Sequence, residues 1–290
     1  MAYRLLPANN KGGVGRTTTA VGITWAVAET GRRVLYVEMD PQGDGDRRLG
    51  VTAETKAQLL AAGNPGIAGV LDPQNKGDNA VGLADIIVPC GWDDPTAQFI
   101  DIVPSLTQQD LELRGMESHV PGAVTRLKRA LRRFDDSKYH MVIINTGSSG
   151  GHLYQMALTA TDWVVLVVIP DVDGIKGAMR VVSYIAGDAN EELPERADPV
   201  KFVGWTVNNS DGSGDHRAYG NENDDEPLTS FIDPFTRQPI PQWLTMRHRP
   251  AWGSAMSAAL PPSQIVHAQT RATVMKIYRA HAAELVKAGI

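Results

Sequence analysis

The chain has 290 residues, of which 42% are hydrophobic and 21% charged; this suits one sizeable α/β domain and excludes a disordered protein. The net charge is −5, so a surface that binds nucleic acid would have to be a local patch. The single cysteine, Cys90, excludes internal disulfides and metal sites built from several thiolates. We therefore expect a reducing, cytoplasmic location, and the lack of long apolar runs predicts no membrane span.

A glycine-rich stretch near the N-terminus is the strongest local signal. Residues 9–19 read N-N-K-G-G-V-G-R-T-T-T, and they follow an apolar segment, Tyr3–Ala8, that we interpret as a strand in spite of Pro7. A segment with helical spacing, Thr17–Glu29, comes next, and Gly31 would end it. Glycines let backbone N–H groups converge, and the first turn of a helix adds its own free N–H groups. The stretch therefore predicts a polyphosphate-binding loop.

The loop departs from the usual P-loop pattern, G-x-x-x-x-G-K-[ST], at two positions. Asn10 stands at the first glycine, and Arg16 stands where the phosphate-binding lysine belongs. An additional lysine, Lys11, precedes the glycine pair. We exclude the dinucleotide-binding pattern G-x-G-x-x-G, since Thr18 occupies the position of its third glycine.

A polar turn follows the next predicted strand. Residues 33–38 read R-V-L-Y-V-E, so a strand, a glycine loop, a helix and a second strand form a βαβ unit. The second strand runs into Glu38, Met39, Asp40 and then Pro-Gln-Gly. By itself D-P-Q-G is good turn chemistry, but its place behind a phosphate loop favours a functional role for its acids.

The later apolar segments predict the rest of a mostly parallel sheet flanked by helices. Residues 209–228 are acidic and lack periodicity, so we interpret them as a flexible loop. We expect one α/β domain over residues 1–290. The predicted strands are 81–88, 99–105, 139–146, 162–170 and 200–207, and the predicted helices are 66–71, 122–134, 155–161, 174–185 and 263–287.

Five motifs, in order and at plausible spacing, resemble the ParA/MinD family of ATPases, and most closely its ParA/Soj-type partitioning proteins. The family's deviant Walker A motif reads K-G-G-x-G-K-[ST]. The resemblance covers about residues 3–288 and implies the three-layer P-loop NTPase fold. The motifs are K-G-G-V-G-R-T (11–17), E-M-D-P-Q-G (38–43), I-D-I-V-P-S (100–105), Y-H-M-V-I-I-N-T (139–146) and A-T-D-W-V-V-L-V-V-I-P-D (160–171).

The resemblance implies a site for ATP and Mg²⁺. Thr17 would contact the magnesium ion, Asp40 would position or activate the attacking water, and Glu38 would lie near the metal. Lys11 would reach the phosphates bound by a second subunit. Asn208 would contact the adenine base, with a simple Asx turn as an equal alternative. The implied nucleotide-binding residues are Lys11, Gly12, Gly13, Val14, Gly15, Arg16, Thr17, Thr18 and Asn208.

Three residues of this implied catalytic shell depart from the family pattern. Arg16 replaces a compact, flexible ammonium by a bulkier planar fork. Asn145 stands where the family has the aspartate of the magnesium shell, so it keeps one acceptor oxygen and loses the charge. Glu38 is one methylene longer than the aspartate it replaces. We expect ATP binding and dimerisation to be retained, and hydrolysis to be slow or lost.

The resemblance also implies partners. ATP would drive a sandwich homodimer, or a higher polymer, that binds double-stranded DNA non-specifically on the nucleoid. A ParB-like centromere-binding protein would stimulate hydrolysis, and the cycle would segregate plasmid, phage or chromosomal DNA. Scattered solvated charges are at least as good an explanation of the basic residues that would contact DNA. These are Lys176, Arg180, Lys201, Arg271, Lys276 and Arg279.

Two other functions stay open. One is a scaffold or filament that keeps ATP as a structural ligand, which would suit the substituted catalytic residues. The other is a MinD-like membrane-positioning ATPase, which needs a basic amphipathic helix at the C-terminus. The last residues, A-E-L-V-K-A-G-I, have few large apolar side chains and one lysine, so we expect no membrane partner. The basic helix predicted over 122–134 is either a solvated face or a partner-binding surface.

Overall fold

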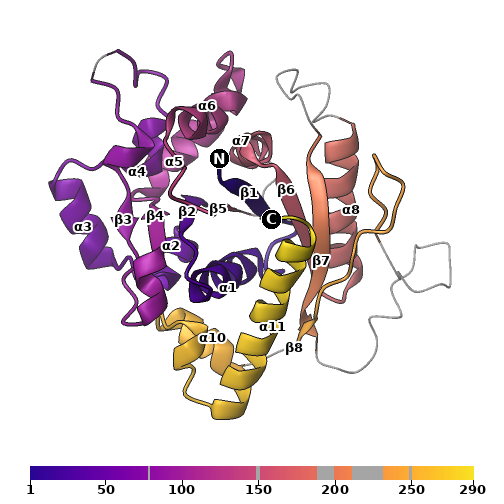
Figure 1. Cartoon of the computed structure of the whole chain (residues 1–290). Helices are drawn as coiled ribbons and strands as arrows, with labels where there is room; N and C mark the ends of the chain where they lie inside the picture. The colour runs from indigo at the N-terminus through magenta and orange to yellow at the C-terminus, as the bar shows by residue number, and fades with distance from the viewer. Residues whose placement is uncertain (78, 148–150, 188–198, 211–230, 248–249) are drawn as a thin grey trace.

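The computed structural model describes residues 1–77, 79–147, 151–187, 199–210, 231–247 and 250–290. Its centre is an eight-stranded sheet in the order β3-β4-β2-β5-β1-β6-β7-β8 (Figure 1). Of the described strand pairs, only β3 with β4 is antiparallel. The strands are β1 (Tyr3–Ala8), β2 (Val34–Met39), β3 (Val88–Pro89), β4 (Ile100–Val103), β5 (Met141–Thr146), β6 (Trp163–Val168), β7 (Lys201–Ser210) and β8 (Met246–Arg247).

Helices cover both faces of the sheet and give three layers (Figure 1). One core contains Leu5 of β1 and the inner sides of α1 (Arg16–Glu29), α10 (Pro250–Ser257) and α11 (Ala268–Lys287). The second core contains Leu6, because successive side chains of a strand point to opposite faces. It is covered by α4 (Gly66–Val70), α5 (Gln108–Met116), α6 (Arg126–Arg133), α7 (His152–Ala160) and α8 (Val172–Ala186). The predicted three-layer α/β fold is confirmed.

Pro7 lies in a central strand. The register of β1 with β5 ends at Leu5, whereas the register with β6 continues through Pro7, opposite Val165, to Ala8. At Pro7, β1 is therefore paired with β6 but no longer with β5. Because the pairing with β5 has already ended, the missing N–H of Pro7 does not interrupt it.

The region between β2 and β4 differs most from the prediction. Two helices, α2 (Asp44–Arg48) and α3 (Ala53–Ala61), were not predicted, and the strand predicted over 81–88 was wrong, since only Val88–Pro89 pair. No residue of α3 is buried, so its sequence has no apolar stripe that could reveal it. Short 3₁₀ helices complete the chain: η1 (Leu83–Asp85), η2 (Pro95–Phe99), η3 (Glu117–His119), η4 (Ala123–Thr125) and η6 (Pro262–Gln264).

Several predicted boundaries shift. The basic helix predicted over 122–134 divides into η4 and α6, and the closing helix α11 begins at Ala268 rather than at residue 263. β7 extends to Ser210, so the first two residues of the predicted acidic loop are strand; residues 211–228 lie outside the described residues. Among the helices that the structure describes, none has the length and apolar character to cross a bilayer.

The parallel strands set the position of the candidate site. Because the carboxyl ends of parallel strands meet at the same edge of a sheet, the loops that follow β1, β2, β5, β6 and β7 converge there. These strand ends carry Asn9, Asp40, Asn145, Asp171 and Asn208.

Candidate nucleotide site

The glycine loop has the backbone of a phosphate socket. Gly13 and Gly15 have φ angles of 76° and 91°, which L-residues with a side chain rarely adopt. Gly15 immediately precedes α1, so the free N–H groups at the start of this helix open onto the loop. A Cβ at Gly15 would also lie 2.5 Å from Nδ2 of Asn208, so the loop and β7 approach too closely for a side chain. The predicted loop and helix start are therefore in place.

Asn9 holds the start of the loop. Its Nδ2 donates to the carbonyls of Val167 and Gly174 at 2.7 and 2.8 Å, and its Oδ1 accepts from the N–H of Lys11 at 2.7 Å. The side chain is fully buried. The motifs in the sequence give Asn9 no role of its own, although a polar residue directly after a buried strand is a signal for one.

Asn208 holds the end of the loop. Its Nδ2 donates to the carbonyls of Val14 and Gly15 at 3.2 and 3.3 Å and to Oγ1 of Thr19 at 3.0 Å. In this structure the side chain thus supports the backbone that would surround the phosphates. A contact with adenine stays a prediction.

Arg16 lies across the loop. Its Nη1 donates to the carbonyl of Asn9, and the side chain is buried. Burial lowers the pKa of Arg16, while Tyr154 and Asp40 oppose that shift. A buried guanidinium beside the socket places positive charge where anionic phosphates would bind.

Lys11 binds Asp171, the residue that directly precedes α8. Its Nζ donates to both carboxylate oxygens at 2.9 and 2.7 Å, and both side chains are partly exposed. Asp171 also caps α8, because its Oδ1 accepts from the N–H of Gly174 at 2.6 Å. No role was predicted for Asp171 from the sequence. The residue is the last of the motif over 160–171, directly after a predicted strand.

Glu38 and Asn145 face each other on neighbouring strands. They are register partners in β2 and β5, and Nδ2 of Asn145 donates to Oε1 of Glu38 at 2.8 Å. Oε1 also accepts from the N–H of Asp40 at 2.9 Å. Oε2 accepts from the N–H groups of Gly45 and Asp46 at 2.8 and 3.2 Å. Four donors therefore engage the carboxylate, which holds the turn after β2.

The pKa of Glu38 is raised well above its usual value. Burial is the main cause, followed by the negative charges of Asp46 and Asp40; the hydrogen bonds from Asp40 and Asn145 counteract it. Glu38 is fully buried. Both carboxylate oxygens of Glu38 already accept two hydrogen bonds each, so the group is a poor magnesium ligand. The metal role expected of Glu38 stays a prediction without structural support.

Asn145 and Thr17 fit a magnesium shell better. Oδ1 of Asn145 is buried and has no hydrogen-bond partner in the structure, which leaves one acceptor available. Thr17 is half-buried in the first turn of α1. A neutral amide oxygen and a hydroxyl suit this hard cation, although they supply no charge of their own.

Asp40 stands at the mouth of the site. It is half-buried, and Oδ1 accepts from the N–H of Gln42 at 3.1 Å. A Cβ at Gly147 would lie 3.3 Å from the same oxygen, so the loop after β5 borders Asp40. Burial raises the pKa of Asp40, and the charge of Arg16 counteracts this. A carboxylate with a raised pKa at this position suits the handling of a water molecule.

A buried ion pair between Asp46 and Lys56, close to the turn that follows β2, was not predicted from the sequence. Asp46 is fully buried, its Oδ1 lies 3.1 Å from Nζ of Lys56, and its Oδ2 accepts from the N–H of Ser105 at 3.0 Å. Lys56 also donates to the carbonyl of Ser105 at 2.8 Å. The pair therefore ties the turn that carries Asp40 to α3 and to the end of β4.

The predicted DNA-binding residues lie in different parts of the molecule. Lys176 and Arg180 are in α8, on one face of the sheet, and Arg271, Lys276 and Arg279 are in α11, whose layer covers the opposite face. Lys201 is the first residue of β7, so it lies where the strand begins, at the opposite end from the candidate nucleotide site. Its Nζ lies 5.0 Å from the centre of the Trp163 ring. These positions do not form one contiguous layer, and a DNA contact stays a prediction for each residue.

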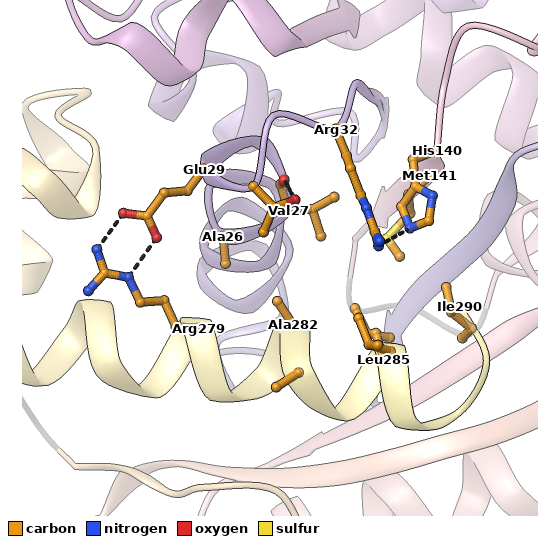
Figure 2. Close-up of a pocket in the computed structure, with 13 residues that line it drawn as sticks. Ala26, Val27, Glu29, Arg32, His140, Met141, Arg279, Ala282, Leu285 and Ile290 are labelled. Carbon is orange, nitrogen blue, oxygen red and sulfur yellow. Dashed lines mark hydrogen bonds and ion pairs between the residues drawn. The ribbon is translucent and has the colours of Figure 1, made fainter.

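Arg279 already has an anionic partner. Its Nε donates to Oε2 of Glu29 at 2.6 Å and its Nη2 to the other oxygen, as Figure 2 shows. The ion pair lies at one end of a small apolar pocket, of about 190 Å³, whose other end holds Arg32 and His140 (Figure 2). Any DNA phosphate would compete with Glu29 for this guanidinium.

Comparison with known proteins agrees with this geometry. The model of a family described as an AAA domain matches residues 5–194. Soj, a chromosome-partitioning ATPase of Thermus thermophilus, is 27% identical over 271 residues, which cover 92% of each chain.

Among solved structures, apo McdA of Cyanothece superposes with a TM-score of 0.73 at 15% identity, over 98% of this chain and 100% of that one. A putative plasmid partition protein of Borrelia burgdorferi, bound to AMPPNP, gives a TM-score of 0.71 at 15% identity over 99% of each chain. At such identities the superpositions show the fold alone. Because the AAA-domain match covers most of the chain and the Soj relative nearly all of it, the chain belongs to the ParA/MinD family of P-loop ATPases.

Proposed function

We propose that this protein is an ATP-dependent DNA-partitioning protein with slow hydrolysis. The observation that supports the proposal is the conformation of the glycine loop, in which Gly13, Gly15 and Arg16 lie in a backbone held by Asn9 and Asn208. Magnesium would be held by Thr17 and Asn145 and, when bound, would neutralise phosphate charge. Partition as the task rests on the similarity to Soj over 92% of the chain.

ATP binding drives dimerisation through Lys11 in this proposal. The Lys11–Asp171 pair is partly exposed, so exchanging a carboxylate for the phosphates of a partner subunit costs little. Light scattering with AMPPNP and Mg²⁺ should give a dimer for the native protein and a monomer for Lys11→Ala. Lys138→Ala, which alters an exposed lysine on the opposite edge, serves as the control. A native monomer at saturating AMPPNP would contradict the dimer.

In this proposal hydrolysis is slow because the positions that would hold magnesium supply little negative charge. Asn145 gives no charge to the magnesium shell, and Glu38 is occupied by four donors. Losing one electrostatic group of this kind costs roughly 2.7–4 kcal/mol of transition-state stabilisation, which lowers the rate by about a hundredfold or more. Steady-state ATPase rates should therefore lie that far below those of Thermus Soj measured in the same assay, with and without DNA. Equal rates would refute slow hydrolysis and leave nucleotide binding intact.

The ATP-bound dimer binds double-stranded DNA without sequence preference and responds to a ParB-like partner in the cytoplasm. Binding through lysine and arginine must weaken steeply with salt. Fluorescence anisotropy of labelled duplexes with AMPPNP, at several salt concentrations, tests this. Binding that is absent, or insensitive to salt, would sink the DNA role.

A structural scaffold is the second candidate, favoured by the same Glu38–Asn145 contact. If turnover is undetectable while AMPPNP and ATP both give stable DNA-bound assemblies, ATP acts as a structural ligand. Release of the assemblies at the pace of ATP turnover would favour the partition cycle instead.

A further inference from the structure

A second cavity, of about 670 Å³, lies away from the nucleotide site, between the segment that follows α4 and helix α6. None of the residues that line it belongs to the predicted nucleotide, metal or catalytic set. Its volume is in the range of small-molecule pockets. The basic segment over 122–134, whose role the partition function does not explain, forms one of its walls.

The lining of the cavity is cationic. Four of its side chains are Lys76, Arg126, Arg129 and Arg133, against two acids, Asp72 and Asp135. Asp72 pairs with Arg114, whose Nη1 lies 3.2 Å from Oδ2, and Arg126 pairs with Glu117. Among the described lining residues this leaves Lys76, Arg129 and Arg133 against Asp135. The walls therefore favour an anion.

Arg126 points to a ligand independently of the charge count. Its side chain is only 10% exposed, and Nη1 donates to Glu117 and, at 3.1 Å, to the carbonyl of Leu71. Its Nη2 is buried and has no hydrogen-bond partner in the structure. A buried guanidinium nitrogen that donates to nothing is costly, so a rotation of the Arg126 guanidinium that brings Nη2 to an anionic oxygen in the cavity would be favourable.

Part of the remaining wall is apolar and is held in place by hydrogen bonds. Val70, Val81, Leu83 and Phe134 contribute apolar surface. Asn75 ties Val81 back to the chain, because its Oδ1 accepts from the N–H of Val81 at 2.7 Å and its Nδ2 donates to the Val81 carbonyl at 2.8 Å. A small ligand with an anionic group and an apolar body matches both kinds of wall.

We propose that this cavity binds a phosphorylated small molecule, with the phosphate on Arg126, Arg129 and Arg133 and the apolar body against Phe134 and Val81. A planar guanidinium presents two parallel donors to phosphate, so three arginines suit this group better than they suit a halide. The site is separate from the ATP site and does not depend on the proposed function.

The probe is 1-naphthyl phosphate, titrated calorimetrically into the full chain with the P-loop saturated by AMPPNP and Mg²⁺. We expect one saturable site, and much weaker binding of inorganic phosphate and of neutral 1-naphthalenemethanol. Arg133→Gln and Lys76→Gln alter exposed side chains and should not disturb folding. Arg133→Gln should weaken binding about tenfold, the effect of losing one charge-assisted hydrogen bond.

Arg132→Gln is the matched control, because Arg132 is exposed on the same helix, carries the same charge and does not line the cavity. It should change the affinity less than twofold. An equal loss with Arg132→Gln, absence of binding in the native protein, or displacement of the probe by a short DNA duplex would overturn the proposal. Arg126→Gln should abolish binding. This variant also breaks the pair with Glu117, so its circular dichroism spectrum and melting temperature must match those of the native protein before a loss of binding is assigned to the site.

Discussion

The side-chain amide of Asn145 donates to the buried carboxylate of Glu38 at 2.8 Å, across two adjacent strands. Both are residues expected from the sequence to depart from the ParA/MinD pattern, and the structure pairs them. An aspartate at 145 would place a second carboxylate against a group whose pKa is already raised by burial. The amide of Asn145 instead supplies a donor to Glu38 and leaves its own Oδ1 without a partner. The side chains at 38 and 145 therefore act as one hydrogen-bonded pair.

Asn145→Asp should destabilise the protein at neutral pH. The change removes a donor from a buried acceptor and adds a like charge, which should cost about 1–3 kcal/mol in the free energy of unfolding. Urea denaturation at pH 7.5 measures it, with Asn79→Asp at an exposed position as control. The deficit should shrink at acidic pH, where one of the two carboxyls binds a proton. Equal stability of variant and native protein at pH 7.5 would show that the contact is dispensable.

Lys56→Met should lower the free energy of unfolding by more than the partial exposure of Lys56 suggests. It leaves Asp46 fully buried without its cation, and breaking a buried pair in this way costs about 3–5 kcal/mol. Lys138→Met removes a lysine whose side chain is 53% exposed from its pair with Asp101, and it should cost less than about 1 kcal/mol. Thermal or urea unfolding distinguishes them. Similar losses for both variants would mean that the Asp46 pair contributes no more than a surface contact.

Asn208→Ala should weaken nucleotide binding through the loop. The variant removes hydrogen bonds to Val14, Gly15 and Thr19, so the dissociation constant for AMPPNP should rise about tenfold, equivalent to about 1.4 kcal/mol. Pyrophosphate, which lacks a base, should lose affinity to the same extent. If only AMPPNP is affected, Asn208 acts on adenine instead of on the loop.

His281 should make stability fall in mild acid. Burial lowers the pKa of His281 from 6.5 to about 4, and its Nε2 lies 2.8 Å from the carbonyl of Leu244. The unfolded chain therefore binds a proton below pH 6.5 that the folded protein takes up only near pH 4. Stability from this group is present above pH 6.5 and is lost progressively as the pH falls toward 4.

The change should reach about 3 kcal/mol between these limits. Urea denaturation from pH 7 to pH 4 measures it. His281→Gln should flatten this part of the profile, whereas His119→Gln, at an exposed position, should leave it unchanged. A native profile that is flat over this range would contradict a buried neutral His281.

The local sequence pattern was sufficient to predict those elements whose residues lie close together in the sequence. Residues 9–19 predict the phosphate loop because glycines, threonines and an apolar helix follow one another directly. β5 and β6 could be predicted from uninterrupted apolar runs. α3 could not, since none of its residues is buried and its sequence therefore carries no helical stripe.

The sequence by itself determined the parallel α/β fold, the loop and the identity of the polar residues at the strand ends, because each depends on composition within a few residues. Only the tertiary structure decided how those residues pair. Glu38 meets Asn145, Lys11 meets Asp171, and Asp46 meets Lys56 across different elements. Such pairs form because parallel strands bring distant strand ends to one edge, and burial then favours arrangements in which charges and amides there find partners.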